Sequence, residues 1–287
     1  MQRLIPDSPL YRGAACVLAG ELLLAFMGAL IKLLSPDMAS SMLVFGRNAV
    51  GLAILLPIML WREGVDCLRT GQLRFHLVRG VVGVSAMYCY FFSLAGLALT
   101  DAILLKLTAP FFIPLIALLW LGERTSLYTL GTIAFGFCGV AVLLQPGHAS
   151  QEDIFFVMAG VSGALLGGSA KVTIRRMGVS EPSARIVVYF AIVATTVSAP
   201  AALLHWQWPT LQQWLALLAV GACATMAQLL ITTAYRIAPA GRIGQFTYSS
   251  VVFAALLGWL IWSDPFTLRQ GLGCLFIVGA GLLNMRR

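Results

Sequence analysis

Three ionisable residues lie well inside long apolar stretches of the sequence, where a charge is unexpected. Glu21 lies about eight residues, or roughly 12 Å of helix, into the first stretch. Arg47 lies near the start of the second stretch, and Lys106 lies one helical turn before Pro110 in the fourth. Because proline removes one backbone hydrogen bond, Pro110 is expected to break this span beside Lys106, with a packing kink as the alternative. An ionised side chain in hydrocarbon is costly and usually faces a cavity or a partner. We therefore interpret Glu21 as a proton-binding carboxylate, and Lys106 and Arg47 as groups that bind an anionic ligand.

Each of the three residues also has a structural interpretation. Glu21 could form a structural ion pair or lie closer to the interface than its position in the stretch indicates. Arg47 could be an interfacial anchor or a packing charge within the helix. Lys106 fits neutralisation of Glu21, or an ammonium that reaches out to the membrane surface. Three further cations lie near the cytoplasmic ends of their stretches, and we interpret them as side chains that extend to the membrane surface. They are left out of the candidate site: Arg79, Lys171 and Arg185.

Uncharged polar residues in the third, fourth, eighth and ninth stretches complete the candidate binding site. Tyrosine and glutamine can orient a ligand by hydrogen bonds, and an aromatic face can hold a ring or a cation. The alternative is hydrogen bonding between helices, worth about 1 kcal/mol per contact. The residues of this set are Tyr88, Tyr90, Thr108, Gln228, Gln245, Tyr248 and Ser249.

The apolar stretches themselves are long enough to cross a membrane. The chain is 60% hydrophobic and 10% charged, whereas a soluble protein carries about 25% charged residues. A span needs about 20 apolar residues in a helix, because only helices or closed barrels satisfy every backbone group without water. Ten segments qualify, which predicts an all-α integral membrane protein with spans near 13–34, 41–61, 77–97, 102–121, 127–145, 155–172, 186–205, 211–235, 243–262 and 268–285.

Positive charge between the spans predicts their orientation. Arginine occurs in every second gap, whereas the opposite gaps, 35–40, 98–101, 146–154, 206–210 and 263–267, contain no lysine or arginine. Basic residues are retained on the cytoplasmic side of a membrane. Both termini are therefore expected to be cytoplasmic, in a multi-pass protein of the cell inner membrane.

The two halves of the chain repeat each other weakly. A shift of 140 positions places Gly131 on Gly271 and Gly139 on Gly279, and it aligns 108–110 with 248–250. We divide the chain into five-helix repeats at 1–146 and 147–287. Because each repeat holds an odd number of spans, the second enters the membrane in the opposite sense. Inverted repeats of this kind can support alternating access.

The chain resembles the ten-helix EamA-type branch of the drug/metabolite transporter superfamily. The resemblance rests on the two five-span halves, on the segments 93–98 and 110–112, and on Gly122, Glu123 and Arg124 followed by the helix of Gly131 and Gly139. The second half departs from it, with Ser263 and Asp264 in place of a Gly-Glu-Arg motif and Ser250 where family members often have proline. The resemblance implies a central cavity lined by spans one, three, four, six, eight and nine, with spans five and ten peripheral. The glycines of span five, Gly131, Gly136 and Gly139, are expected to serve close helix packing and not ligand binding.

These observations favour a secondary transporter of small organic metabolites over other classes. One acid and two bases in the expected cavity suit amino-acid-like or carboxylate substrates, moved by alternating access with proton coupling or by exchange. The alternative is an integral-membrane enzyme acting on a lipid or a small metabolite, but no catalytic or metal-binding spacing is seen. We expect no cofactor, metal or nucleic acid, and the partners are a small-molecule substrate and membrane lipid, with a homodimer left open.

Overall fold

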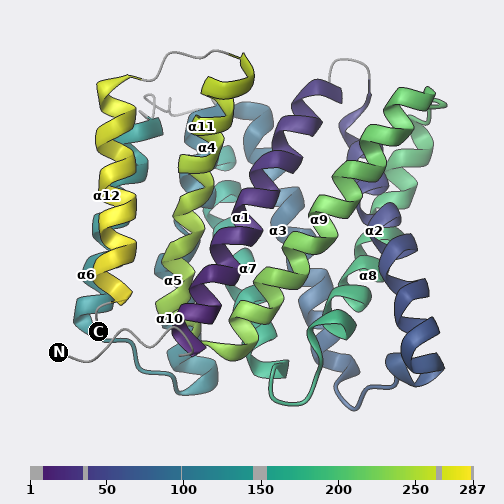
Figure 1. Ribbon diagram of the computed structural model, residues 1–287, viewed down its shortest axis with the longest axis horizontal. Coiled ribbons are helices and arrows are strands. Elements are labelled where there is room, and N and C mark those ends of the chain that lie inside the picture. Colours follow the sequence, from purple (N-terminus) through teal and green to yellow (C-terminus); the bar gives the residue numbers. More distant parts are fainter. Residues whose placement is uncertain (1–8, 35–37, 98, 145–153, 263–266, 286–287) are drawn as a thin grey trace.

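The computed structural model describes residues 9–34, 38–97, 99–144, 154–262 and 267–285, and these form a bundle of helices (Figure 1). The predicted division between 146 and 147 lies outside the described residues. The helices of the first half are α1 (Pro9–Leu34), α2 (Ser40–Glu63), η1 (Gly64–Leu68), α3 (Leu73–Gly96), α4 (Leu99–Lys106), α5 (Ala109–Leu121) and α6 (Leu127–Leu144). Those of the second half are α7 (Ile154–Met177), α8 (Ser183–Leu204), α9 (Leu211–Ile237), α10 (Ala240–Ile243), η3 (Gly244–Tyr248), α11 (Ser249–Trp262) and α12 (Leu268–Met285).

The predicted ten-span, all-helical architecture is confirmed. Nine helical segments of the described chain are long and apolar enough to cross a membrane, and a tenth, Leu127–Val142, is shorter. An even number of crossings places the start of α1 and the end of α12 on one side of the bundle (Figure 1). There the Tyr11 hydroxyl donates to the Met285 carbonyl at 3.5 Å. We call this side the terminal end.

The fourth span is broken, as the position of Pro110 predicts. Helix α4 ends at Lys106 and α5 begins at Ala109. Proline has no N–H, so Pro110 cannot donate to the carbonyl of Lys106, the residue four positions earlier. The Thr108 hydroxyl instead donates to the Leu105 carbonyl at 2.6 Å. The irregular backbone therefore places Lys106 directly at the break.

The ninth span is broken at the equivalent place, which the sequence analysis did not predict because no proline is present. The 140-residue shift pairs Ala109, where α5 begins, with Ser249, where α11 begins after the 3₁₀ segment η3. Two serine hydroxyls satisfy backbone carbonyls here: Ser249 donates to Phe246 at 2.7 Å, and Ser250 donates to Thr247 at 2.8 Å. The break in the second half is thus accompanied by hydroxyl-to-carbonyl hydrogen bonds without a proline, whereas the break in the first half contains Pro110.

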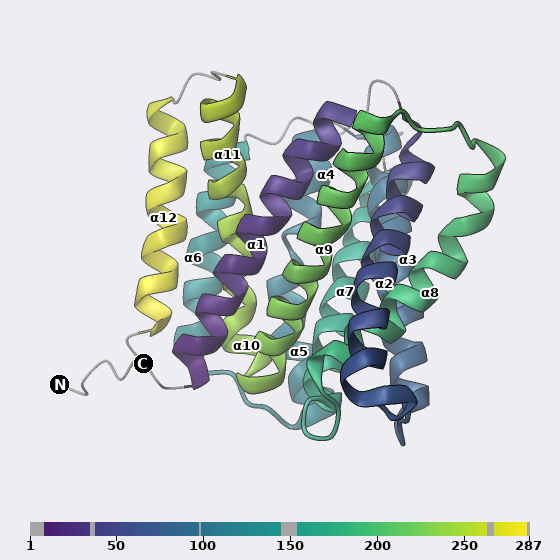
Figure 2. The same ribbon diagram turned by 45° about the vertical axis from the view of Figure 1, so that its right-hand side comes forward.

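The two halves pack against each other in a symmetric set of helix pairs. The most extensive contacts join α1 to α9, α3 to α7, α2 to α8 and α6 to α12. If α1 is equivalent to α7 and α3 to α9, the first two pairs exchange under the repeat and the last two map onto themselves. Helices α1 and α9 lie side by side along their lengths in Figure 2.

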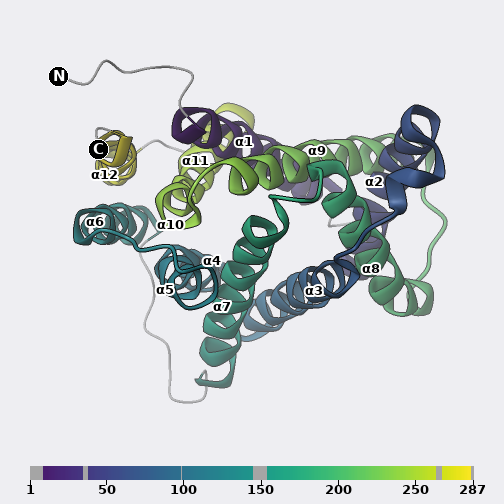
Figure 3. The same ribbon diagram turned by 90° about the horizontal axis from the view of Figure 1, so that it is seen from below.

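Helices α6 and α12 form a peripheral pair at one edge of the bundle, as the resemblance implied (Figures 1 and 3). A side chain at Gly139 would lie 2.7 Å from Phe276 Cβ, so glycine permits the close approach of the two helices. The predicted packing role of this glycine is confirmed. It is wrong for Gly131, which has open space at its Cβ position.

Candidate functional site

Glu21 lies near the middle of α1 and is 4% exposed. Its neighbour in sequence, Gly20, lets α1 lie close on α9, because a Cβ there would come within 2.7 Å of Ile231 Cγ1. This close packing fixes the carboxylate inside the bundle. Its electrostatic partners are the ammonium groups of Lys171 and Lys106. No salt bridge within 4.0 Å involves Glu21 in the part of the chain that the structure describes.

Thr247 connects Glu21 to the second half of the chain. The Lys171 ammonium donates to the Thr247 hydroxyl oxygen at 3.1 Å, and that hydroxyl also interacts with the Glu21 carboxylate. The Lys171 ammonium lies 5.6 Å from the centre of the Tyr235 ring. The Tyr235 hydroxyl is buried here and interacts with the Thr247 hydroxyl. An acid, a base and two hydroxyls from α1, α7, η3 and α9 therefore meet in one place.

Lys106 reaches this group from the break in the fourth span. Its ammonium lies 4.9 Å from the centre of the Tyr90 ring on α3, and it interacts with Glu21 on α1 and Arg47 on α2. The side chain nevertheless has a large accessible surface. A cation that faces three other helices and still has accessible surface can be reached by water or by a small molecule.

Lys171 and Arg79 correct the expectation that both reach to the membrane surface. Lys171 points to Glu21 and Thr247, as described above. Arg79 is 6% exposed, and its guanidinium lies 4.2 Å from the centre of the Phe190 ring and 3.5 Å from the Gln228 carbonyl oxygen. It also interacts with Arg47. Both residues are within two helical turns or so of a span end, and sequence position alone did not reveal that their long side chains turn inward.

Not all of the predicted polar residues join this group. Gln245 is 3% exposed and neither atom of its amide has a hydrogen-bond partner among the described residues, which suits a ligand or water contact. The hydroxyls of Thr108 and Ser249 donate to the backbone at the two breaks. Tyr248 packs beside Phe137 in the cluster between α6 and α12, and Tyr88 is exposed. The structure thus gives Gln245 more support as a binding residue than Thr108, Ser249, Tyr248 or Tyr88.

A carboxylate in the loop after α5 joins the two halves at the terminal end. Glu123 Oε1 accepts from Arg175 Nε on α7 at 2.7 Å, and Glu123 Oε2 accepts from the Ala240 N–H of α10 at 3.2 Å. Arg175 also donates to the Arg236 carbonyl at 2.9 Å. The loop that carries the Gly-Glu-Arg motif is therefore bonded to two elements of the second half, α7 and α10.

A second carboxylate joins the halves in the reverse direction. Glu181, between α7 and α8, accepts hydrogen bonds from Thr70 in the first half and from Arg185, the latter at 2.9 Å. His76 on α3 lies 3.6 Å from the same carboxylate. Burial raises the pKa of Glu181, but the bonds from Thr70 and Arg185 outweigh it and hold that pKa below its ordinary value. The contact is thus one that stabilises an ionised carboxylate.

Comparison with known proteins assigns the chain to a family. A model of the EamA-like transporter family matches residues 11–145 and, a second time, residues 154–286. The chain belongs to the EamA-like transporter family. The resemblance drawn from the sequence is therefore confirmed, and the double match agrees with the two packed halves. Membership also makes the chain a multi-pass membrane protein and a transporter of small metabolites.

The relatives within the EamA-like family carry different names. The "Pseudopaline exporter CntI" of Pseudomonas aeruginosa is 32% identical over 260 residues, which are 90% of each chain. A "Riboflavin transporter" of Brucella anthropi is 25% identical over 86% of this chain and 88% of its own length. An "S-adenosylmethionine uptake transporter" of Rickettsia bellii is 26% identical over 81% of this chain and 79% of its own.

A solved crystal structure has the same fold as this EamA-like chain. It superposes with a TM-score of 0.83 and covers 95% of this chain and 96% of its own. The sequence identity is 20%, so the likeness concerns the fold alone.

Proposed function

We propose that the chain is a secondary transporter that moves small organic anions and zwitterions bearing carboxylates across the cell inner membrane, with both termini cytoplasmic. The relatives named above take three different compounds, so the choice of substrate has to rest on the interior of this chain. Glu21, Lys106 and Lys171 are the proposed centre of the site, with Tyr90, Thr247 and Gln245 around them. Tyr88, Thr108, Tyr248 and Ser249 stay predictions with less support.

One observation carries this proposal: the interacting charges inside the bundle are unequal in sign. Four cations, Arg47, Arg79, Lys106 and Lys171, interact with one another or with a single described acid, Glu21. Uncompensated charge is costly in a membrane. A substrate carboxylate would supply the missing negative charge, whereas a cationic substrate would add to the repulsion.

Glu21 is proposed as the proton-coupling residue. A carboxylate held between two ammonium groups can release them in two ways, by binding a proton or by separating when a substrate carboxylate takes its place. Protonation of Glu21 would leave Lys106 and Lys171 free to hold the substrate. Substrate binding and proton binding would then favour the same state, which is the requirement for coupled movement.

The two broken spans are proposed to supply the moving elements of alternating access. Irregular backbone inside a membrane protein is found where it lines a cavity or a path. Here one break carries Lys106 and the other carries Thr247, so each half contributes a polar break to the same site. Rocking of one inverted half against the other would expose this site to each side in turn.

Transport by purified protein in liposomes tests the proposal. The panel contains radiolabelled dicarboxylates, neutral and acidic amino acids, riboflavin and S-adenosylmethionine, each tested by counterflow. We expect exchange of compounds that bear carboxylates, and weaker exchange at low substrate concentration in Lys106→Met. If riboflavin exchanges and every compound that bears a carboxylate fails, S-adenosylmethionine included, the proposed substrate class is wrong.

A further inference from the structure

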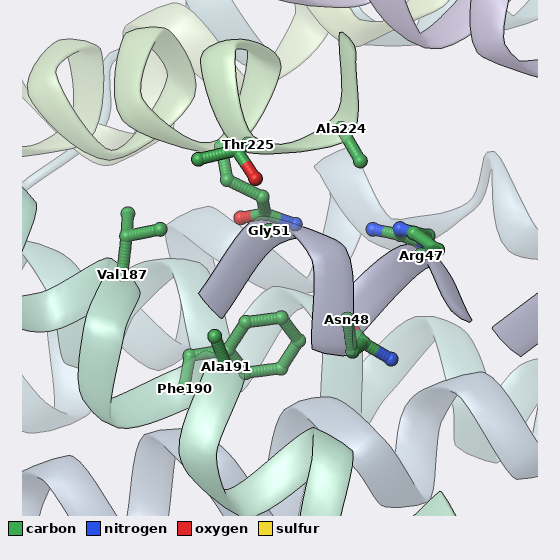
Figure 4. A pocket seen from close by; sticks show the side chains of 9 residues that line it. Arg47, Asn48, Gly51, Val187, Phe190, Ala191, Ala224 and Thr225 are labelled. Carbon is green, nitrogen blue, oxygen red and sulfur yellow. The ribbon is translucent and has the colours of Figure 1, made fainter. Parts of the chain in front are cut away.

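A small pocket lies beside the proposed site, between α2, α8 and α9 (Figure 4). Arg47 and Asn48 of α2, Phe190 of α8 and Thr225 of α9 lie around it (Figure 4). Its volume is about 20 Å³, which is enough for one group the size of a water molecule. A carboxylate oxygen or a chloride ion is of this size.

The pocket is lined mainly by apolar residues, with a few polar groups between them. The Asn48 NH₂ group donates to the Val44 carbonyl at 2.9 Å, and the Thr225 hydroxyl donates to the Gly221 carbonyl at 2.8 Å. The donors of these two residues are therefore used within their own helices, and their oxygens remain acceptors. Gln228, which also lines the pocket, accepts from Arg79 with its carbonyl oxygen. Its NH₂ group is then left to donate, together with Arg47.

Arg79 adds a second positive charge at the edge of the pocket. It stacks on Phe190 and donates to Gln228, and both of these residues line the pocket. The Nε atoms of Arg47 and Arg79 are buried without a hydrogen-bond partner among the described side chains. No described carboxylate lies within 4.0 Å of either guanidinium. A bound anion would stabilise two neighbouring guanidinium groups that have no carboxylate partner.

We propose that Arg47, Arg79 and Gln228 form an anion subsite for a second carboxylate of the transported compound, separate from the Glu21 and Lys106 group. This inference rests on the proposed function and adds to it a preference for substrates with at least two carboxylates. Arg47 and the Gln228 NH₂ group would hold the anion. Arg79 would position Gln228 and add charge. A singly charged anion from solution, such as chloride, has the same chemistry, so the test has to separate the two sources.

The test measures how succinate, its monomethyl ester and chloride change the thermal unfolding of the full-length protein in detergent, with isethionate as the reference anion. We expect succinate to raise the melting temperature more than its monomethyl ester does. Arg47→Gln and Arg79→Gln should reduce the succinate response at least fivefold. Arg176→Gln is the matched control, because Arg176 is an exposed cation on α7, and it should respond as the wild type does.

Gln228→Glu keeps the test decisive if removal of an arginine prevents folding. Its carboxylate would occupy the subsite and pair with both arginines, so this variant should fold at least as stably as the wild type and lose the succinate preference. A wild-type response to chloride that Gln228→Glu abolishes would also support the subsite, with a free anion as its occupant. An unchanged response to both anions in Gln228→Glu overturns it.

The same measurement separates failure of the subsite from failure of the proposed function. If Lys106→Met loses the succinate response and Gln228→Glu retains it, the transport proposal stands and the second subsite is wrong. If the wild-type protein responds to neither succinate nor its ester, the second subsite is wrong, and the counterflow panel decides the proposed function on its own.

Discussion

At the scale of single residues, one carboxylate, Glu21, is shared by several cations inside the bundle. Glu21 interacts with Lys171 and Lys106, and Lys171 is also held by Thr247 at 3.1 Å. No ion pair within 4.0 Å involves Glu21 among the described residues, so this carboxylate is free to change partners. A fully paired buried ion pair would be a more rigid and more structural arrangement.

The two lysines should contribute separately to substrate affinity. A hydrogen bond to a charged group contributes about 1.5 to 3 kcal/mol, which corresponds to about tenfold or more in affinity. Lys106→Met and Lys171→Met are each expected to raise the KM for a carboxylate substrate by about tenfold. Initial rates in proteoliposomes measure this, with Arg176→Gln as the control. A wild-type KM in Lys171→Met would return that residue to the membrane-surface role that its sequence position suggested.

At the scale of elements, the two broken spans differ in how the break is produced. Pro110 removes a donor from α5, whereas Ser249 and Ser250 bind backbone carbonyls ahead of α11. A missing N–H cannot be restored by motion, but a serine hydroxyl can exchange its partner at little cost. The second-half break is therefore the more adaptable one.

Replacing Pro110 should make span four more regular. Pro110→Ala restores an N–H that can donate to the Lys106 carbonyl, so α4 and α5 should become more continuous. We expect a melting temperature equal to or above that of the wild type and a several-fold lower transport rate. The control is Pro57→Ala, which changes a proline inside α2. Full transport activity in Pro110→Ala would show that the break is a packing feature.

The spans and one of the two breaks could be predicted from the sequence, and the features that were missed have physical causes. The length and apolarity of each stretch predicted the spans, and Pro110 predicted the first break. The second break was missed because a serine disrupts a helix only where its hydroxyl finds a carbonyl, which depends on the local backbone. Lys171 and Arg79 were missed because helical position gives the height of a Cα atom. It does not give the direction of a long side chain.

At the scale of the whole molecule, charged contacts between the halves gather at the terminal end. Glu123 of the first half bonds to Arg175, and Glu181 of the second half bonds to Thr70. On the opposite side, the halves meet through apolar residues such as Met42 and Leu217. The two mouths of the bundle are therefore held by different interactions, and acid should affect one more than the other.

The Glu181 contact predicts a pH dependence of stability. The pKa of Glu181 is held below its ordinary value in the folded protein, so the contact stabilises the fold above the ordinary glutamate range, about pH 4. This stabilisation is lost as the pH falls through the lowered folded-state pKa. Glu181→Gln should therefore melt at a lower temperature than the wild type near pH 7. The difference should shrink in acid; if it is constant with pH, Glu181 does not titrate as described.

The central claim is that Glu21 couples a proton to the movement of an anionic substrate through two inverted halves. Its most direct test compares two modes of transport in the same proteoliposomes, counterflow exchange and accumulation driven by a pH gradient. For Glu21→Gln, which keeps the shape and removes the titration, we expect counterflow to persist and pH-driven accumulation to be lost. Accumulation of wild-type size and pH dependence in Glu21→Gln would contradict the account.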